Sequence, residues 1–163
     1  MAKNKEEKTN VMRVLEQKKI AYTAHTYPHE EGMAVDGVTV AQSMGFDPAI
    51  VFKTLVARGA SKQYYVFDVP VAENLDLKKA AKAVGEKSIE MIHQKELLPL
   101  TGYVHGGCSP VGMKKLFPTV FHSSAENLAA MIVSAGKIGY QVELAPHDLA
   151  ALVRAKFADI IVE

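Results

Sequence analysis

The sequence predicts a mixed α+β fold in which helices pack outside a mixed, partly barrel-like sheet. Short runs of β-branched and aromatic residues, which are typical of strands, recur along the whole chain. Segments with apolar residues at helical spacing lie between some of these runs. The two kinds of segment do not follow the strict strand–helix–strand alternation of a parallel sheet. We therefore expect a sheet with both strand directions and helices outside it.

Composition predicts one domain over residues 1–163, with 48% hydrophobic and 23% charged residues. The net charge of +1 argues against a protein that coats nucleic acid, but it allows a local basic patch. The single cysteine excludes an internal disulfide framework. The charged N-terminus lacks the apolar core of a signal peptide, and no apolar run approaches the roughly 20 residues that span a bilayer. These features predict a cytoplasmic protein with no membrane partner.

Helices are predicted where apolar residues recur at helical spacing and a capping residue or glycine marks an end. They cover Thr9–Lys19, Thr39–Met44, Asp76–Val84 and His147–Ala155. Strands are predicted at Ala21–Tyr27, Ala49–Ala57, Tyr64–Val69, Ser88–Ile92, Thr119–His122, Met131–Ser134 and Tyr140–Leu144, with a closing strand at Ile160–Val162. The turn Gly59–Lys62 joins the second and third strands into a hairpin.

Lys53 stands in the middle of an otherwise apolar strand. Side chains alternate along a strand, so Lys53 shares its face with Val51, Leu55 and Ala57. Full burial of an unpaired ammonium costs several kcal/mol even after relaxation. Two interpretations follow from this run: the ammonium extends from a strand edge to water, or it faces a ligand at the floor of a pocket.

The segment Thr101–Met113 contains four glycines, which indicates positive φ angles or the close approach of another chain or a ligand. Free backbone amides in such a loop can bind a phosphate or a carbonyl oxygen. A tight connection between elements is the alternative. The loop is not a Walker motif, because Lys114 and Lys115 are displaced and no Lys-Ser/Thr ending is present.

No residue shows the pattern of a protein nucleophile or a metal ligand. Cys108 has His105 three residues before it, but the sequence shows neither a base within reach nor an orienting third group, so a small, semi-buried thiol is favoured. His25 and His29 are separated by Pro28, which disfavours the helix that would align them on zinc. Ser134 ends a strand before a glycine turn, where polar groups either face a cleft or simply form the turn.

Several short motifs appear together in order, at a spacing that resembles the YbaK/EbsC family. These bacterial Cys-tRNA(Pro) deacylases are related to the editing domain of prolyl-tRNA synthetases. The resemblance runs from about Asn10 to Asp159. It is carried by Phe52-Lys53-Thr54-Leu55, Asp76-Leu77-Lys78-Lys79, Thr101-Gly102-Tyr103, Gly106-Gly107-Cys108-Ser109-Pro110 and Val133-Ser134-Ala135-Gly136-Lys137.

The resemblance implies the family's fold and the hydrolysis of a mischarged aminoacyl-tRNA, Cys-tRNA(Pro), without a cofactor or a metal. Lys53 would be the catalytic residue, which positions the aminoacyl-adenosine while the substrate's own thiol attacks its ester. Its partners would be proline tRNA and prolyl-tRNA synthetase. Substrate-binding residues would be Tyr27, Thr54, Gly106, Gly107, Cys108, Ser109, Pro110 and Ser134.

Five lysines are candidate contacts to the tRNA backbone. Lys78, Lys79 and Lys82 lie on one face of a predicted helix, and Lys114 and Lys115 follow the glycine loop. The alternative for the helix is an ordinary solvated face.

The chain departs from the better-known deacylase at two positions. Asp36 lies in a Val-Asp-Gly segment where that protein has an aromatic residue, and Gln141 replaces an acid. Both differences bear on whether Cys, Ala or another amino acid is preferred. They also leave two other functions open: an adaptor that binds tRNA or a synthetase without turnover, and a regulatory pocket for a small ligand.

Overall fold

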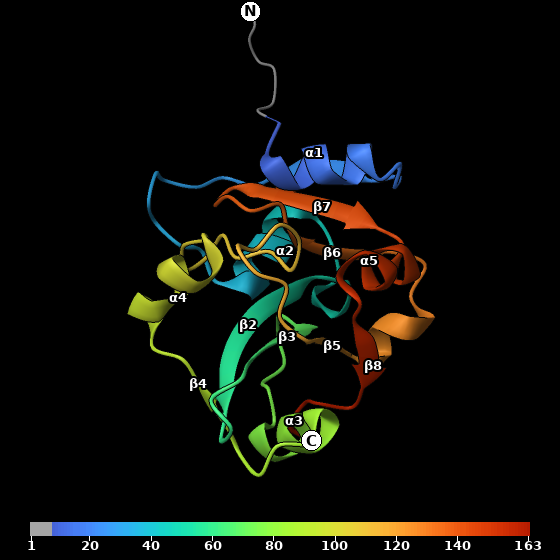
Figure 1. Cartoon of the computed structure of the whole chain (residues 1–163). Helices are drawn as coiled ribbons and strands as arrows, with labels where there is room; N and C mark the ends of the chain where they lie inside the picture. Colours follow the sequence, from blue (N-terminus) through green and yellow to red (C-terminus); the bar gives the residue numbers. More distant parts are fainter. Residues whose placement is uncertain (1–7) are drawn as a thin grey trace, which may run out of the picture.

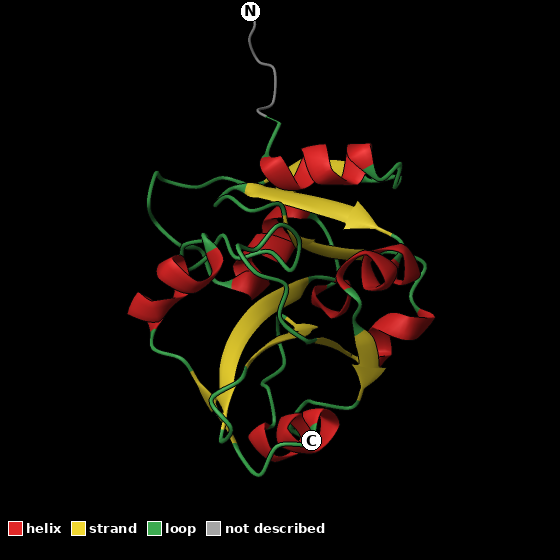
Figure 2. Ribbon diagram, in the orientation of Figure 1, coloured by secondary structure: helices red, strands yellow, loops and turns green. Residues whose placement is uncertain are grey.

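The computed structural model describes residues 8–163 and has a mixed α+β architecture with two sheets, which confirms the predicted fold class (Figures 1 and 2). The smaller sheet is antiparallel, in the order β1 (Thr23–Thr26), β7 (Tyr140–Leu144) and β6 (Met131–Ser134). The larger sheet is mixed, in the order β4 (Ile89–Met91), β2 (Phe52–Gly59), β3 (Tyr64–Pro70), β5 (Thr119–His122) and β8 (Lys156–Ala158).

Five α-helices and two short 3₁₀ helices lie around the sheets in the described part of the chain (Figure 2). The α-helices are α1 (Asn10–Gln17), α2 (Gly37–Met44), α3 (Leu77–Val84), α4 (Gln94–Thr101) and α5 (Pro146–Val153). The 3₁₀ helices are η2 (Pro48–Ile50) and η3 (Ser123–Asn127). Their ends follow local chemistry. Asp76 accepts hydrogen bonds from the amides of Lys78 and Lys79 at 2.9 and 3.0 Å and so caps α3, which ends at Gly85 with φ of 74°.

The largest cluster of buried apolar residues joins both sheets. Val11 and Leu15 of α1 belong to it, as do Phe52 of β2, Val133 of β6 and Val142 of β7. Burial of a valine, leucine or phenylalanine side chain contributes about 1.5–3 kcal/mol each. A second cluster lies between α3 and the other face of the larger sheet. The pocket described below therefore lies between elements fixed on both sides by packing.

The two sheets part beside the first half of β2. Val51 and Ile132 form one isolated bridge, after which β6 and β2 are no longer paired. On the same outer edge, β4 pairs only with the residues from Ala57 to Gly59. Among residues 8–163, no strand pairs with that edge of β2 between Phe52 and Leu55. This part of β2 therefore presents an open strand edge.

Two expectations about elements need correction. Helix α4 was not predicted, since Pro99 lies inside it and its apolar residues have little helical periodicity. The closing strand at Ile160–Val162 is wrong: the last strand is β8, which pairs in parallel with β5. Ile161 instead forms a single bridge with Leu75.

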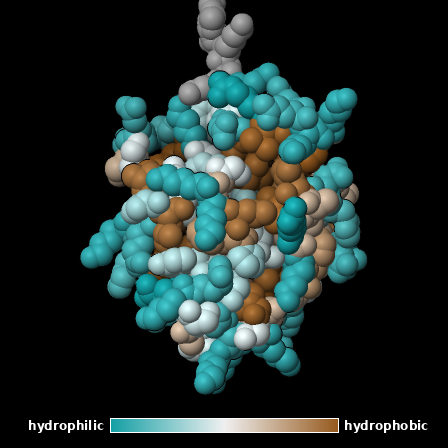
Figure 3. Space-filling view, in the orientation of Figure 1, coloured by the Kyte–Doolittle hydropathy of each residue, from teal (hydrophilic) through white to brown (hydrophobic). Residues whose placement is uncertain are grey.

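Apolar side chains also gather across the middle of the face in Figure 3, with hydrophilic side chains around them. Exposed large hydrophobic residues include Leu98 on α4 and Val104 and Leu116 in the segment that follows it. In the part of the chain that is described, no helix is long and apolar enough to cross a membrane.

Candidate active site

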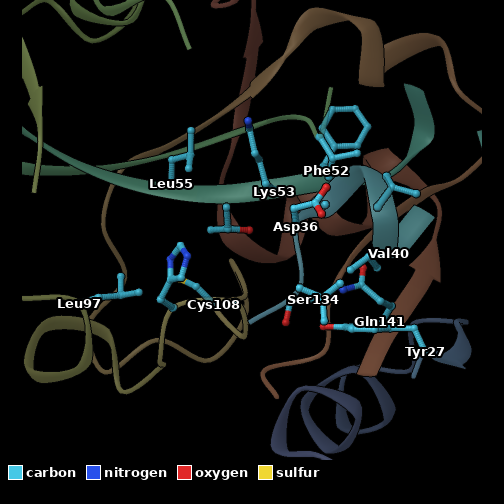
Figure 4. Close-up of a pocket in the computed structure, with 17 residues that line it drawn as sticks. Tyr27, Asp36, Val40, Phe52, Lys53, Leu55, Leu97, Cys108, Ser134 and Gln141 are labelled. Carbon is cyan, nitrogen blue, oxygen red and sulfur yellow. The ribbon is translucent and has the colours of Figure 1, made fainter. Parts of the chain in front are cut away.

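A pocket of about 310 Å³ lies where the two sheets part (Figure 4). Four consecutive residues of β2, from Phe52 to Leu55, line it. Neighbouring side chains of a strand point to opposite faces, so such a run can line one pocket only if the pocket extends around the strand edge. The open edge of β2 provides this geometry. Apolar side chains from other segments complete much of the wall: Val35, Val40, Val51, Val71 and Leu97.

Lys53 lines the pocket and is half-buried. Its ammonium makes no hydrogen bond and no ion pair within 4.0 Å to any residue from 8 to 163. Burial lowers the pKa of the Lys53 ammonium, and the more distant Glu73 carboxylate opposes this shift. The amine is thus partly removed from water without a charged partner in the described part of the chain, which is the arrangement of a cation that binds an anionic or polar ligand.

Figure 4 shows the Lys53 and Leu55 side chains on one side of β2, and Cys108, Ser134 and Gln141 on the other. This agrees with strand alternation, because Leu55 and Ala57 pack with the second cluster on the Lys53 side. A ligand that touches both Lys53 and Ser134 must therefore pass along the open edge.

The side of the pocket opposite Lys53 contains the chain's one cysteine. Cys108 is buried, and burial raises the pKa of its thiol to about 12, with a further contribution from the nearby Asp68 carboxyl. A thiol with this pKa is almost wholly protonated at neutral pH. Cys108 is thus a small apolar wall residue of the pocket, as the sequence favoured.

Ser134 and Gln141 face each other across the β6–β7 pair. Both are 7% exposed and both line the pocket. Ser134 Oγ accepts a hydrogen bond from the Gly136 amide at 3.0 Å, which fixes the hydroxyl at the strand end. Gln141 Oε1 is buried and has no hydrogen-bond partner among the described residues. A buried acceptor without a partner costs about 1–3 kcal/mol, so this oxygen is suited to a donor from a ligand.

Tyr27 follows β1 and is 5% exposed. Its amide donates to the Gly139 carbonyl at 3.0 Å, which holds it beside the turn between β6 and β7. Burial raises the pKa of the Tyr27 hydroxyl, so this group is a neutral hydrogen-bonding residue of the pocket.

The glycine loop approaches other backbone segments too closely for larger residues. A Cβ on Gly106 would lie 2.7 Å from the Cβ of Ala34, and Gly106 has φ of 91°. A Cβ on Gly107 would lie 3.1 Å from the amide nitrogen of Ile138. Gly106 is therefore required where the loop passes Ala34, and at Gly107 the loop is in tight contact with the backbone of Ile138.

The structure brings five of the predicted substrate-binding residues to the pocket: Tyr27, Thr54, Gly106, Cys108 and Ser134. The other three, Gly107, Ser109 and Pro110, are buried and support the loop without lining the cavity. Ser109 Oγ accepts a hydrogen bond from the Val111 amide at 3.2 Å. Their roles toward a ligand stay a prediction.

The lining also contains two polar residues that were not among the predicted substrate-binding residues. His105 is exposed and lines the pocket, although it was considered only as a base for Cys108. Asp36 lines it too, but its carboxylate caps α2 by accepting from the Thr39 amide at 3.2 Å and hydroxyl at 2.6 Å. These bonds lower the pKa of Asp36. The departure at Asp36 thus has a structural reason: it begins a helix.

The predicted tRNA contacts lie in two separate places. Helix α3, which carries Lys78, Lys79 and Lys82, is at the end of the molecule near the C-terminus (Figure 1). The Lys79 ammonium is bound to Asp159, Glu163 and the Ile161 carbonyl at 2.9–3.3 Å. Lys114 and Lys115 follow the glycine loop, whose residues His105, Gly106 and Cys108 line the pocket.

The described residues contain no group of three or more His, Cys, Asp or Glu side chains that could hold a metal ion.

The chain belongs to the aminoacyl-tRNA editing domain family, whose model matches residues 29–152. This confirms the resemblance seen in the sequence motifs.

Similar proteins agree with this assignment. Over 161 residues the chain is 46% identical to an Enterococcus faecalis protein named "Putative Cys-tRNA(Pro)/Cys-tRNA(Cys) deacylase EbsC", with 98% of both chains covered. A solved structure described as "a putative trans-editing enzyme for prolyl tRNA synthetase" has a TM-score of 0.78 and 25% identity, and the match covers 94% of this chain and 95% of that one. A hypothetical protein with 18% identity and a TM-score of 0.82 shares the fold over 93% of this chain and 99% of its own.

Proposed function

We propose that this protein is a trans-editing deacylase that hydrolyses the ester of mischarged Cys-tRNA(Pro). Family membership and the name of the 46% identical relative support this activity. The observation that carries it is a pair of polar groups, on the two sides of the open β2 edge, that have no hydrogen-bonding partner among the described residues. Among residues 8–163, Lys53 has no partner for its ammonium and Gln141 has no donor for its buried oxygen. An aminoacyl ester lying along the edge supplies both: acceptor oxygens for Lys53, and an α-ammonium for Gln141.

The chemistry requires no nucleophile from the protein. Cys108 is held in its thiol form, and Ser134 Oγ is bound to a backbone amide. In the proposed reaction the cysteine sulfur of the substrate gives up its proton and attacks its own ester carbon. A C–S bond forms, the C–O bond to the ribose breaks, and the departing 3′-oxygen takes a proton. Water then opens the resulting thiolactone.

Lys53 has a positioning and electrostatic role in this scheme. As the thiolate attacks, negative charge develops on the carbonyl oxygen, and an ammonium stabilises it more strongly in a partly dry pocket than in water. Binding of thiol and ester in one cavity would supply much of the barrier reduction through proximity. Lys53 acts neither as a base nor as a nucleophile.

The tRNA body would extend from the pocket past the glycine loop. Lys114 and Lys115 would contact phosphates there, since Lys114 Nζ donates to the neutral Pro99 carbonyl at 3.3 Å, whereas Lys79 is bound to two carboxylates. Prolyl-tRNA synthetase is the proposed partner that delivers proline tRNA, in keeping with the description of the solved structure that shares 25% identity. The proposed substrate places the reaction in the cytoplasm.

A panel of charged tRNAs tests the function. The protein is incubated with proline tRNA charged with cysteine, alanine or serine, and the remaining ester is measured over time. Serine is the matched control, because it replaces only the thiol with a hydroxyl. We expect fast hydrolysis of Cys-tRNA(Pro), with thiolactone trapped as its first product, and slow hydrolysis of Ser-tRNA(Pro). Equal rates for cysteine and serine would contradict the thiol mechanism, and no hydrolysis of any member would contradict the deacylase function.

A further inference from the structure

Asp68 is a fully buried carboxyl group directly behind the pocket wall. It lies on β3 opposite Thr54 of β2, and its exposed fraction is 0%. Thr54 Oγ1 donates a hydrogen bond to Asp68 Oδ1 at 2.5 Å. The second oxygen, Asp68 Oδ2, has no hydrogen-bond partner among residues 8–163. Neither the resemblance nor the proposed reaction gives Asp68 a role.

No charged group of the described residues balances Asp68. From β2 it faces the neutral hydroxyl of Thr54, and on β5 its register partner is Phe121. From the glycine loop the Cys108 thiol is close, and Tyr103 lies beyond this thiol. Lys53 pairs with Val69, so it is on the opposite face of the sheet and does not compensate Asp68. Burial therefore raises the pKa of Asp68 to about 7, although the Thr54 hydrogen bond lowers it in part.

The Thr54 hydroxyl has only one proton, and that proton is committed to Asp68 while the carboxyl is ionised. Thr54 lines the pocket, so its oxygen can then offer a ligand only lone pairs. We infer that Asp68 sets the polarity of the Thr54 hydroxyl, making it a hydrogen-bond acceptor for the ligand when Asp68 is ionised and a donor when Asp68 is protonated. In the protonated state the carboxyl donates to Thr54 Oγ1 and frees the threonine proton toward the cavity.

Asp68 is in this way a positioning residue that acts through Thr54. The ligand group beside Thr54 at neutral and higher pH must be a donor, and the α-ammonium of an aminoacyl ester fits, because it has three N–H groups and so can donate to Thr54 as well as to Gln141. The identity of this donor rests on the proposed deacylase function, whereas the titration of Asp68 and its coupling to Thr54 do not.

The titration is measured by carbon-13 NMR of the aspartate carboxyls, with the Asp68 signal assigned by its loss in Asp68→Asn. We expect a midpoint near 7 in the wild type, and a higher midpoint in Thr54→Val, because the hydroxyl that lowers the pKa is gone. Thr54→Ser keeps the hydroxyl and should restore the wild-type midpoint. A wild-type midpoint near the ordinary value of 3.8, or one that Thr54→Val leaves unchanged, would overturn the assignment.

Ligand polarity is measured with an amide-linked cysteinyl-adenosine, which cannot be hydrolysed. Its dissociation constant should rise about tenfold in the wild type as the pH falls through 7, in excess of the change in Asp68→Asn. The ligand's own titration is common to both proteins and cancels. Asp148→Asn, on the exposed surface of α5, is the matched control and should behave as the wild type. Identical pH profiles for the wild type and Asp68→Asn would refute the coupling; absence of binding at every pH, with the NMR result intact, would refute the proposed ligand instead.

Discussion

Lys53 and Asp68 lie on neighbouring strands, one position out of register, yet their side chains lie in different environments. Lys53 pairs with Val69, and Asp68 pairs with Thr54, so the two ionisable side chains are on opposite faces. Lys53 is half-buried and lines the pocket, whereas Asp68 is fully buried behind it. One group is accessible to a ligand, and the other can influence the ligand only through a neighbour.

The two groups do not form an ion pair, and the directions of their pKa shifts agree with this. In an ion pair the pKa of the lysine would rise and that of the aspartate would fall. Here burial lowers the pKa of Lys53 and raises that of Asp68, so both are shifted toward their neutral forms. A separation of one residue along the strand therefore prevents a neutralising contact. It leaves a cation available to a ligand on one face and a titrating acid on the other.

The largest expected effect is the pH dependence of the unfolding free energy that Asp68 causes. Because its pKa is near 7 rather than 3.8, the folded state binds more protons than the unfolded state between about pH 4 and 7. Stability should fall as the pH rises through this window and level off above it. The full change corresponds to on the order of 4 kcal/mol for this buried group. Urea unfolding across this range measures it. Asp68→Asn should lack the decline, and an equal decline in both proteins would contradict the shifted pKa.

A smaller effect is expected at the loop that closes the pocket. Gly106→Ala places a Cβ 2.7 Å from the Ala34 Cβ at a φ of 91°, so it should lower the unfolding free energy by about 2–3 kcal/mol. Gly32→Ala is the matched control: φ is 76°, but a Cβ there meets no atom within 4 Å. It should cost only about 1 kcal/mol, from backbone strain alone. If thermal or urea unfolding showed the same loss of unfolding free energy for both variants, the close contact with Ala34 would contribute nothing.

The smallest effect concerns the lysines on the surface. Changing Lys114 and Lys115 to Gln should weaken tRNA binding about tenfold and reduce the slope of log affinity against log salt by about 1–2. The pair Lys78 and Lys82 on α3 provides the comparison, and the same change there should alter the slope little. Filter binding of proline tRNA at several salt concentrations distinguishes the two faces. A larger slope change from the α3 pair would assign the tRNA to the other end of the molecule.

Local chemistry in the sequence predicted much of the fold. The strands Thr119–His122, Met131–Ser134 and Tyr140–Leu144 were predicted with their observed bounds, because β-branched runs end there at turn residues. The last strand was misplaced because β8 depends on a long-range parallel pairing with β5, which short-range patterns do not contain. Helix α4 was not predicted because Pro99 lies inside it, and proline disfavours the interior of a helix.

The site was predicted less completely. Lys53 stood out because a charge interrupts an apolar run, and the structure places it in the pocket. Asp68 interrupts a similar run, Tyr64–Val69, and the same signal could have found it. Its coupling to Thr54 could not be predicted, because it requires the β2–β3 register and the burial of both oxygens. The open edge of β2 likewise depends on where β4 and β6 stop pairing.

Single-turnover deacylation of Cys-tRNA(Pro) by Lys53→Ala tests most directly the claim that the accessible cation carries the function. Lys87→Ala is the control, since Lys87 is an exposed lysine that does not line the pocket beside β2. We expect Lys53→Ala to fold normally and to lose at least about 100-fold in rate, the usual effect of removing a group that stabilises charge on a reacting oxygen. Lys87→Ala should retain the wild-type rate. A Lys53→Ala protein that deacylates as fast as Lys87→Ala would contradict the account.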